Sequence, residues 1–349
     1  MTHILPEFQV VAIVIKSLLS IRTGAIVAAL VSGFLVRAVS SAELSDAVHD
    51  KSVEHCRELI RSCQLSDGLI RMRGDSELVR GVPYFANMAA IALLATCDCG
   101  SERSDVGRVR RWLDWYAAHQ MPDGTIHKYS GTVRSYAPTA KLDTTDTSAS
   151  FYLLTLNHYR KACHGCYLGK RLGISADCAI DAVTSLVDPT DGLTWARSGN
   201  RNKYLMDNIL VSVCMADAEE LFDALGKPQR ATQARQIRLG IMESVRRFLP
   251  QGAKHFAWAI GPSGRLSTGL DLPYPHGRAN LYAVAHLDDI PQGLWPRLRD
   301  EYPMAKLVMT TRGYFAARRA GSAEDCARFR SKVLAQALAL RPNNCDVFE

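Results

Sequence analysis

The chain has 349 residues, of which 47% are hydrophobic and 22% are charged, and its formal net charge at pH 7 is +7. This composition is typical of a folded globular protein and excludes a disordered or fibrous chain. The basic residues are dispersed and form no long tract, so no nucleic-acid partner is expected.

The N-terminal segment has the features of a secretory signal. Basic residues precede a thirteen-residue apolar run over 24–36, and small residues at Ser40 and Ala42 follow it. This order is typical of a signal peptide, and the run is short for a membrane span. We therefore expect residues 1–42 to be cleaved and the protein to be periplasmic or secreted. Arg37 interrupts the exit region, which leaves a retained N-terminal membrane anchor as the alternative.

All ten cysteines follow the predicted signal peptide, and an even number permits disulfides in an oxidising compartment. Two of them form a C-x-x-C pair at 163–166, a spacing that also occurs in redox and zinc sites. No second C-x-x-C completes a four-ligand zinc set. We expect disulfides, with unpaired thiols as the alternative, and neither a metal nor a cofactor.

Helical periodicity dominates the chain after residue 43. Residues 83–96 are apolar nearly all round, which predicts a buried helix, and Val109, Trp112, Leu113 and Tyr116 follow the i, i+3, i+4, i+7 pattern of an amphipathic one. Further helices are predicted at about 42–64, 145–162, 175–187, 202–225, 227–249, 275–287, 291–303 and 322–340. Strand patterns are scarce and are confined to 69–73, 255–260 and 308–316. The long polar connections 121–143 and 188–202 are typical of functional loops.

An Asp-Gly pair follows a predicted helix three times, at 67–68, 123–124 and 191–192. Turn chemistry alone explains each pair, because glycine supplies the positive φ that ends a helix. The recurrence nevertheless predicts equivalent corners of a repeated helical hairpin. Hairpins closed into a ring would form an (α/α) toroid with its loops on one rim.

Five segments carry a resemblance to a known family. In chain order they are "VPYFANMAAIALL", "WLDWYAAHQMPDGTIHKY", "LDTTDTSASFYLLTL", "DGLTWARSGNRNKYLMDNILV" and "LPYPHGRANLYAVAHL". Over roughly residues 50 to 290 the chain resembles the secreted bacterial six-hairpin glycosidase-like proteins. The resemblance implies an all-α fold, an (α/α)6 barrel of helical hairpins with few short strands in the loops, as one domain over 43–349. It also implies a glutamate shortly after Asn208, where this chain has Ile209 and Leu210.

Three carboxylates are the catalytic candidates. Glycoside hydrolysis needs one acid to protonate the leaving oxygen and one carboxylate to activate water or attack carbon. If Asp143 and Asp146 both lie in a helix, their spacing places them on one face, where each favours the protonated form of the other. Helix capping is the structural alternative. Asp207 lies in an apolar helix, where a carboxylate is costly unless it is paired or faces a cavity.

Aromatic faces can stack on sugar rings, and amide, imidazole and carboxylate groups can bind hydroxyls. On this basis, and from the resemblance, the substrate-binding candidates are Tyr84, Asn87, Trp115, Asp123, His127, Asp191, Trp195, Asn208, Tyr274 and His276. Turn chemistry is the alternative for the two aspartates, and a solvated loop position is the alternative for the first histidine.

The leading hypothesis is an exported glycoside hydrolase that cleaves a polysaccharide or oligosaccharide, with inversion because a wide cleft can hold both sugar and water. A polysaccharide lyase using His127, Tyr129 and Arg134 is one alternative. A non-catalytic carbohydrate-binding protein is another, and the missing glutamate favours it. A terpene-cyclase-like toroid is least supported, because the chain has no Asp-x-Asp-Asp run.

Overall fold

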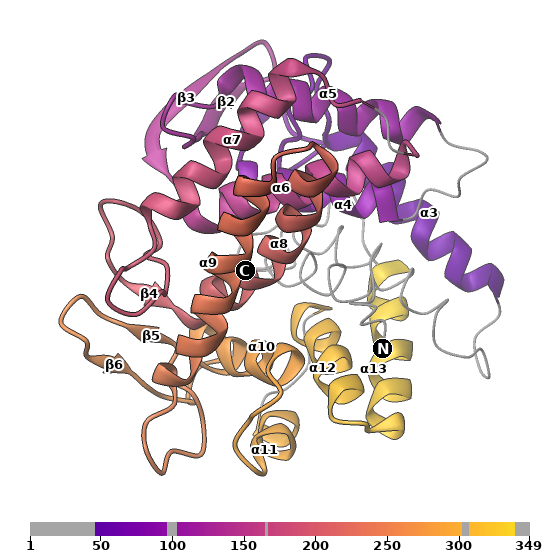
Figure 1. Ribbon diagram of the computed structural model, residues 1–349. Helices are drawn as coiled ribbons and strands as arrows, with labels where there is room; N and C mark the ends of the chain where they lie inside the picture. Colours follow the sequence, from indigo (N-terminus) through magenta and orange to yellow (C-terminus); the bar gives the residue numbers. More distant parts are fainter. Residues whose placement is uncertain (1–45, 96–102, 165–166, 302–306, 339–349) are drawn as a thin grey trace.

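The computed structural model describes residues 46–95, 103–164, 167–301 and 307–338, and these residues are mostly helical (Figure 1). The α-helices are α3 (Asp46–Cys63), α4 (Pro83–Ala95), α5 (Arg103–His119), α6 (Thr145–Ala162), α7 (Lys170–Ser185), α8 (Leu205–Ala224), α9 (Pro228–Ser244), α10 (Arg278–His286), α11 (Leu294–Glu301), α12 (Leu307–Arg319) and α13 (Ala323–Leu338). A short 3-10 helix follows α9 over Val245–Phe248, and a π-helical turn over Pro273–Gly277 precedes α10.

Two small antiparallel sheets decorate the helices. One has the order β1 (Leu78–Gly81), β2 (His127–Thr132) and β3 (Ser135–Leu142), and the other β4 (Lys203–Tyr204), β5 (Ala259–Ile260) and β6 (Leu266–Ser267). The first occupies much of the predicted 121–143 loop. The predicted strand near 255–260 is partly present as β5. Near 69–73 only Ile70 makes an isolated bridge, to Gln64.

The predicted strand at 308–316 is wrong, because these residues lie in α12. β-Branched residues here favour a strand locally, but propensity is a weak prior that packing overrides. α12 packs between α10 and α13, and Tyr314 and Phe315 are buried. A helix in this position buries the apolar side chains that a short strand would leave without a partner.

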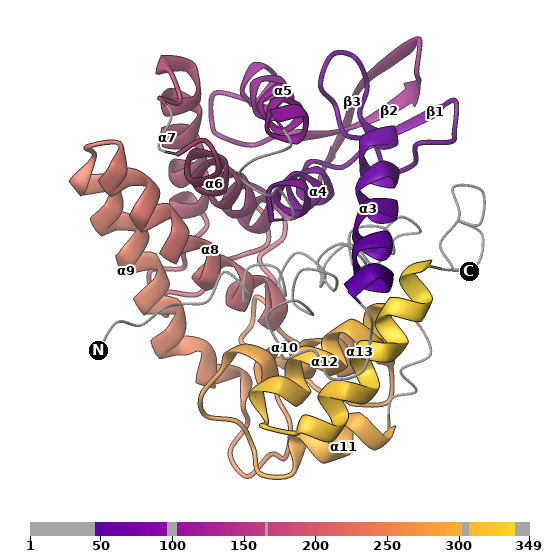
Figure 2. The same cartoon turned by 90° about the vertical axis from the view of Figure 1, so that its right-hand side faces the viewer.

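The helices form an inner and an outer layer of a ring (Figure 2). Successive inner helices pack side by side, in the order α4, α6, α8, α10 and α12. The outer helices α5, α7 and α9 pack against the inner layer and against one another, and α13 meets α3. The expectation of an all-α fold of helical hairpins, with few short strands in the loops, is confirmed.

The inner helices are apolar because they are surrounded. α4 is buried along almost its whole length, and its polar Asn87 is fully buried. Asn87 Oδ1 accepts a hydrogen bond from Trp112 Nε1 at 2.9 Å, and its Nδ2 donates to Ser148 O at 3.3 Å. A buried amide with both ends satisfied joins three helices without leaving a polar group unpaired.

The three Asp-Gly corners are structurally equivalent. The aspartate Oδ1 of each accepts a hydrogen bond from the backbone N–H two residues later, at 3.2, 3.0 and 3.1 Å for Asp67, Asp123 and Asp191. Each glycine has a positive φ and lies against the next outer helix: Gly68 against α5, Gly124 against α7 and Gly192 against α9. The internal repeat predicted from the sequence is therefore a repeated contact between a corner and the neighbouring hairpin.

Within the described residues, no helix combines the length and apolar character needed to cross a bilayer. The predicted signal peptide or anchor lies outside the described residues. So does Cys166, one half of the C-x-x-C pair. Cys56 and Cys214 are buried thiols, and burial raises the pKa of each.

The corner at Gly124 can be tested directly. A Cβ added at Gly124 would lie 2.0 Å from the carbonyl oxygen of Cys178, whereas one at Gly226, which also has positive φ, would meet nothing within 4 Å. Both Gly→Ala changes carry a left-handed backbone cost of about 1–2 kcal/mol. Gly124→Ala adds overpacking of about 1–3 kcal/mol. Urea unfolding should therefore show a larger loss for Gly124→Ala. Equal losses would contradict the corner contact.

Candidate active site

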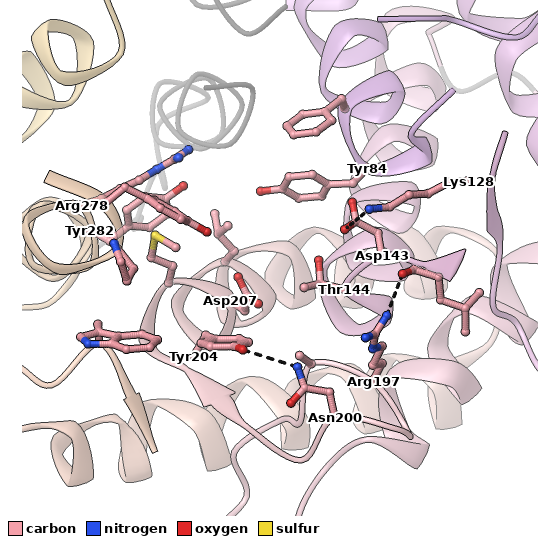
Figure 3. Close-up of a pocket in the computed structure, with 18 of the residues that line it drawn as sticks. Tyr84, Lys128, Asp143, Thr144, Arg197, Asn200, Tyr204, Asp207, Arg278 and Tyr282 are labelled. Carbon is pink, nitrogen blue, oxygen red and sulfur yellow. Dashed lines mark hydrogen bonds and ion pairs between the residues drawn. The ribbon is translucent and has the colours of Figure 1, made fainter. Parts of the chain in front are cut away.

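The described residues enclose a cavity of about 800 Å³ at one end of the ring. Its walls come from α4, the end of the β2–β3 hairpin, the loop around 196–200, the start of α8, the segment before β5, and the π-helical turn with α10. Figure 3 shows Arg278 and Tyr282 at one end of the pocket, and Lys128, Asp143 and Arg197 at the other. Asp207 lies between the two ends.

Asp207 is the central acid of the pocket. It lies in the first turn of α8, directly after β4 has brought the chain to the pocket wall. Burial and the nearby charge of Asp143 raise the pKa of Asp207 to about 7, while Arg278 acts in the opposite direction. A carboxyl group with this pKa can hold and release a proton near neutral pH.

Asp143 lies on the opposite wall, between the end of β3 and the start of α6. Its Oδ1 is 2.9 Å from Lys128 Nζ, and both side chains are partly exposed to the pocket. Lys128 belongs to the neighbouring strand β2, so the hairpin supplies the acid and its counter-charge together. The ion pair holds the Asp143 side chain against a positive charge at the pocket wall.

The predicted pairing of Asp143 and Asp146 on one helix face is wrong. Thr144 is the N-cap of α6, so Asp143 precedes the helix and Asp146 lies inside its first turn. Asp146 is fully buried and is not part of the pocket wall. Its two carboxylate oxygens accept hydrogen bonds from Thr147 N at 2.8 Å and Thr194 Oγ1 at 2.9 Å. Burial, followed by the charge of Asp207, raises the pKa of Asp146 well above its usual range.

Asn208 connects Asp146 to the pocket wall without lining it. Its Oδ1 accepts from Thr194 N at 2.7 Å, and its Nδ2 donates to Thr194 O at 3.1 Å and to Tyr204 O at 3.0 Å. Thr194 in turn donates to Asp146 through its hydroxyl. This buried set, which we call the Asn208 clamp (Asp146, Thr194, Tyr204 O and Asn208), fixes the segment that leads to Arg197.

The same geometry recurs one hairpin later. Asn280 in α10 accepts from Phe256 N at 2.8 Å, and donates to Phe256 O and His276 O, both at 3.1 Å. This Asn280 clamp (Phe256, His276 O and Asn280) positions the segment that carries Trp258. Because both asparagines sit in the first turn of an inner helix, each clamp ties a pocket wall to the ring.

Stacked aromatic rings form one wall. The Trp258 ring is nearly parallel to that of Tyr204, at 6.2 Å between ring centroids and 9° between planes, and it also contacts His276, at 5.9 Å and 23°. Tyr204 and Trp258 line the pocket. His276 does not line it, and its Nδ1 lies 2.8 Å from Asp271 Oδ1. Such a wall offers a flat face to a sugar ring.

Tyrosines complete the other walls. Tyr274 is exposed at the rim, with the Arg278 guanidinium 5.1 Å from its ring centroid. Tyr84 lies in the pocket wall opposite, where burial and then Tyr282 raise the pKa of its hydroxyl well above the usual range. The predicted candidates Tyr84 and Tyr274 therefore do line the pocket.

Six other predicted substrate-binding residues lie outside this pocket. Asn87 and Trp115 are buried in the helix core, and Trp115 stacks on Trp112 and His119. The remaining four are Asp123 and Asp191 in the Asp-Gly corners, His127 at the start of β2, and Trp195 beneath Arg201.

Asp191 has a structural role that explains its conspicuous position. Lys203 Nζ lies 2.7 Å from Asp191 and 2.6 Å from Asp188, and all three side chains are largely buried. Burial acts to raise the pKa of Asp188, but hydrogen bonds from Lys203 and Thr190 outweigh it and lower the pKa to about 2. The lysine thus pairs with the 188–192 corner and not with Asp207.

Several pocket residues escaped the sequence analysis: Lys128, Lys141, Arg197, Asn200, Tyr204, Trp258, Arg278 and Tyr282. Arg278 and Tyr282 are four positions apart on α10, a spacing that places two side chains on one helix face. In the sequence, Tyr274, Arg278 and Tyr282 recur at intervals of four residues, and this helical spacing could have identified Arg278 and Tyr282 as neighbours of Tyr274. The position expected to hold a glutamate is Leu210, which lines the pocket with Met206. No group of three or more potential metal ligands occurs among the described residues.

No protein-family model matches the sequence, and neither does any curated protein. The structure is similar to a sugar epimerase from a ruminal bacterium, with a TM-score of 0.55 and 9% identity over 90% of this chain and 75% of that one. It is also similar to a rhamnosidase from Klebsiella oxytoca with rhamnose bound (TM-score 0.55, 15% identity, 84% and 56% covered). A third is cellobiose 2-epimerase from Spirochaeta thermophila DSM 6192 (TM-score 0.51, 10% identity, 97% and 86% covered). The chain therefore shares the (α/α)6 fold of these structures.

The interaction between the two pocket acids predicts that the pKa of Asp207 depends on the charge of Asp143. Asp143→Asn should lower the pKa of Asp207 by about one unit, because it removes the negative charge that opposes ionisation. Carbon-13 NMR titration of aspartate carboxyls, assigned with Asp207→Asn, measures this. Asp123→Asn, in an exposed corner, should leave the Asp207 curve unchanged. An Asp207 pKa that stays near 7 in Asp143→Asn would show that burial alone sets it.

Proposed function

We propose that the protein is a carbohydrate-processing enzyme, and specifically a glycoside hydrolase with Asp207 as general acid and Asp143 as its partner carboxylate. The observation that carries this proposal is the contrast between the two acids. Burial raises the pKa of Asp207 to about 7, while Asp143 is paired with Lys128 across the same pocket. Glycoside hydrolysis requires two carboxyl groups with different roles, one that donates a proton and one that activates water.

In the proposed reaction, protonated Asp207 donates its proton to the glycosidic oxygen as the bond from that oxygen to the anomeric carbon breaks. Asp143 removes a proton from a water molecule as the water oxygen bonds to the same carbon, which inverts its configuration. A cavity of about 800 Å³ has room for a sugar and this water. Trp258 and Tyr204 offer the stacking face.

The structural neighbours support a sugar substrate. The sugar epimerase, the rhamnosidase and the cellobiose 2-epimerase are named for sugars, although they represent different reactions. We extend the substrate class to this chain as part of the proposal. The choice of hydrolysis over epimerisation rests on the two acids alone, so the products must be identified chemically.

A lyase is less well supported by the geometry. His127, Tyr129 and Arg134 are not part of the pocket wall, and Tyr129 is packed against Trp115. Tyr84 does line the pocket, but burial raises the pKa of its hydroxyl well above 10, which disfavours it as a base at neutral pH. A binding protein without activity is the outcome expected if sugars bind but no product forms.

We also propose that the protein is exported, on the basis of the basic flank, apolar run and small-residue exit within residues 1–42. N-terminal sequencing of the protein recovered outside the cytoplasm should begin at or near Glu43. An intact N-terminus in the membrane fraction would support the retained anchor instead.

The catalytic assignment predicts the effect of removing each acid. Asp207→Asn and Asp143→Asn should each lower kcat/KM by about 10²- to 10⁴-fold, because one loses proton donation and the other loses water activation. The measurement is reducing-sugar release over a panel of polysaccharides and oligosaccharides, with NMR of the first-formed anomer and ultraviolet detection of unsaturated products. Asp123→Asn is the matched control, since asparagine can make the same turn outside the pocket.

The activity should decrease at high pH. Because Asp207 must carry its proton, activity should fall as the pH rises through about 7, the pKa of this group. A falling limb far above pH 7, or full activity in Asp207→Asn, would exclude this residue as the acid. A retained anomer would exclude inversion, and an epimerised sugar would exclude hydrolysis.

A further inference from the structure

The pocket contains more positive than negative side chains. Its two carboxylates are Asp143 and Asp207, and its four cations are Lys128, Lys141, Arg197 and Arg278. Lys128 is matched by Asp143 at 2.9 Å. With Asp207 in its protonated form, only one carboxylate stands against four cations.

Arg197 is held in place by backbone contacts and not by an acid. Its Nη1 donates to Leu142 O at 2.9 Å, and its own backbone pairs with Asn200 in a tight turn. Among the described residues Arg197 makes no ion pair with a carboxylate. Figure 3 shows its guanidinium at the same end of the pocket as Asp143. A planar donor group fixed in this way is suited to a carboxylate ligand.

Arg278 strengthens the positive field from the opposite end. The residue is only 4% exposed, yet it lines the pocket beside the Tyr274 ring. Its positive charge acts on Asp207 and opposes the rise in the pKa of that carboxyl group. Arg278 therefore adds to the positive potential at the end of the pocket away from Arg197 (Figure 3).

From this arrangement, we infer that the saccharide bound in this pocket is acidic: it contains a uronic acid residue, and Arg197 binds its carboxylate. The inference rests on the proposed function for the identity of the site and narrows its substrate class. Lys141, which is exposed at the rim beside Leu142, adds to the attraction of an anionic chain. The sugar ring itself lies against Trp258 and Tyr204 in this arrangement.

Binding to the intact protein tests the inference without relying on turnover. Calorimetry at about pH 5.5, where Asp207 holds its proton, would compare oligosaccharides of galacturonate, glucuronate and mannuronate with their carboxyl-reduced counterparts. At least one uronate oligosaccharide should bind ten-fold or more tightly than its neutral counterpart. Arg197→Met should weaken binding of that uronate by about 10- to 100-fold, the range for a hydrogen bond to a charged group.

Arg201→Met is the matched control. It removes the same charge from the same loop, but Arg201 lies over Trp195 and outside the pocket, so uronate affinity should stay unchanged. Arg197→Lys should recover part of the affinity, because it restores the charge without the planar fork. An equal loss in Arg201→Met would overturn the assignment, since general attraction and not Arg197 would then explain binding.

The remaining outcomes separate this inference from the proposed function. If every neutral counterpart binds as tightly as its uronate, or if no uronate binds, the acidic-substrate inference is overturned. If a sulfated neutral oligosaccharide binds more tightly than every uronate, the carboxylate assignment is overturned as well. Product formation, measured in the same mixtures, tests hydrolysis separately. Uronate binding without reducing ends would support the acidic ligand and contradict the hydrolase.

Discussion

The hydrogen bonds of Asn208 are the constraint on which the site depends. Its amide binds both backbone groups of Thr194, and Asp146 holds the Thr194 hydroxyl from the other side. The three residues come from α8, a loop and α6, so the ring of helices and the pocket wall share one buried network. Such a network is stable only when its members are all satisfied. The carboxylate that resembled a catalytic partner thus serves to position a loop.

The Asn280 clamp makes the same set of hydrogen bonds in the next hairpin. Together the two clamps fix the loop segments that form the pocket wall against the ring of helices. Tyr204 and His276 each lie four residues before a clamping asparagine, and both give their backbone carbonyl to it. The side chain of each lies next to the Trp258 ring. Two equivalent helix starts, fixed in the same way, therefore build the aromatic wall between them.

The sequence was sufficient for the fold because its signals were local and repeated. The Asp-Gly corners and the apolar inner helices report hairpin geometry directly, and Asp207 was identifiable from its apolar helix. The sequence analysis wrongly expected Asp146 in the pocket, because the residue at which α6 begins determines whether its side chain faces the pocket or the core. Arg197 and Trp258 lie in irregular segments, where no periodicity predicts side-chain direction. Their positions follow from long-range clamps that a single sequence does not show.

The residue that replaces the expected glutamate also bears on the acid. Leu210 lies three positions after Asp207 in α8 and therefore shares its helix face, and Met206 lines the same wall. Apolar neighbours remove water from a carboxyl group and favour its protonated form, which is the first cause of the raised pKa of Asp207. A glutamate at this position would oppose ionisation of Asp207 through its own charge, as Asp143 does. Leu210 acts instead by keeping water away from the carboxyl group, so the raised pKa of Asp207 does not depend on the missing glutamate.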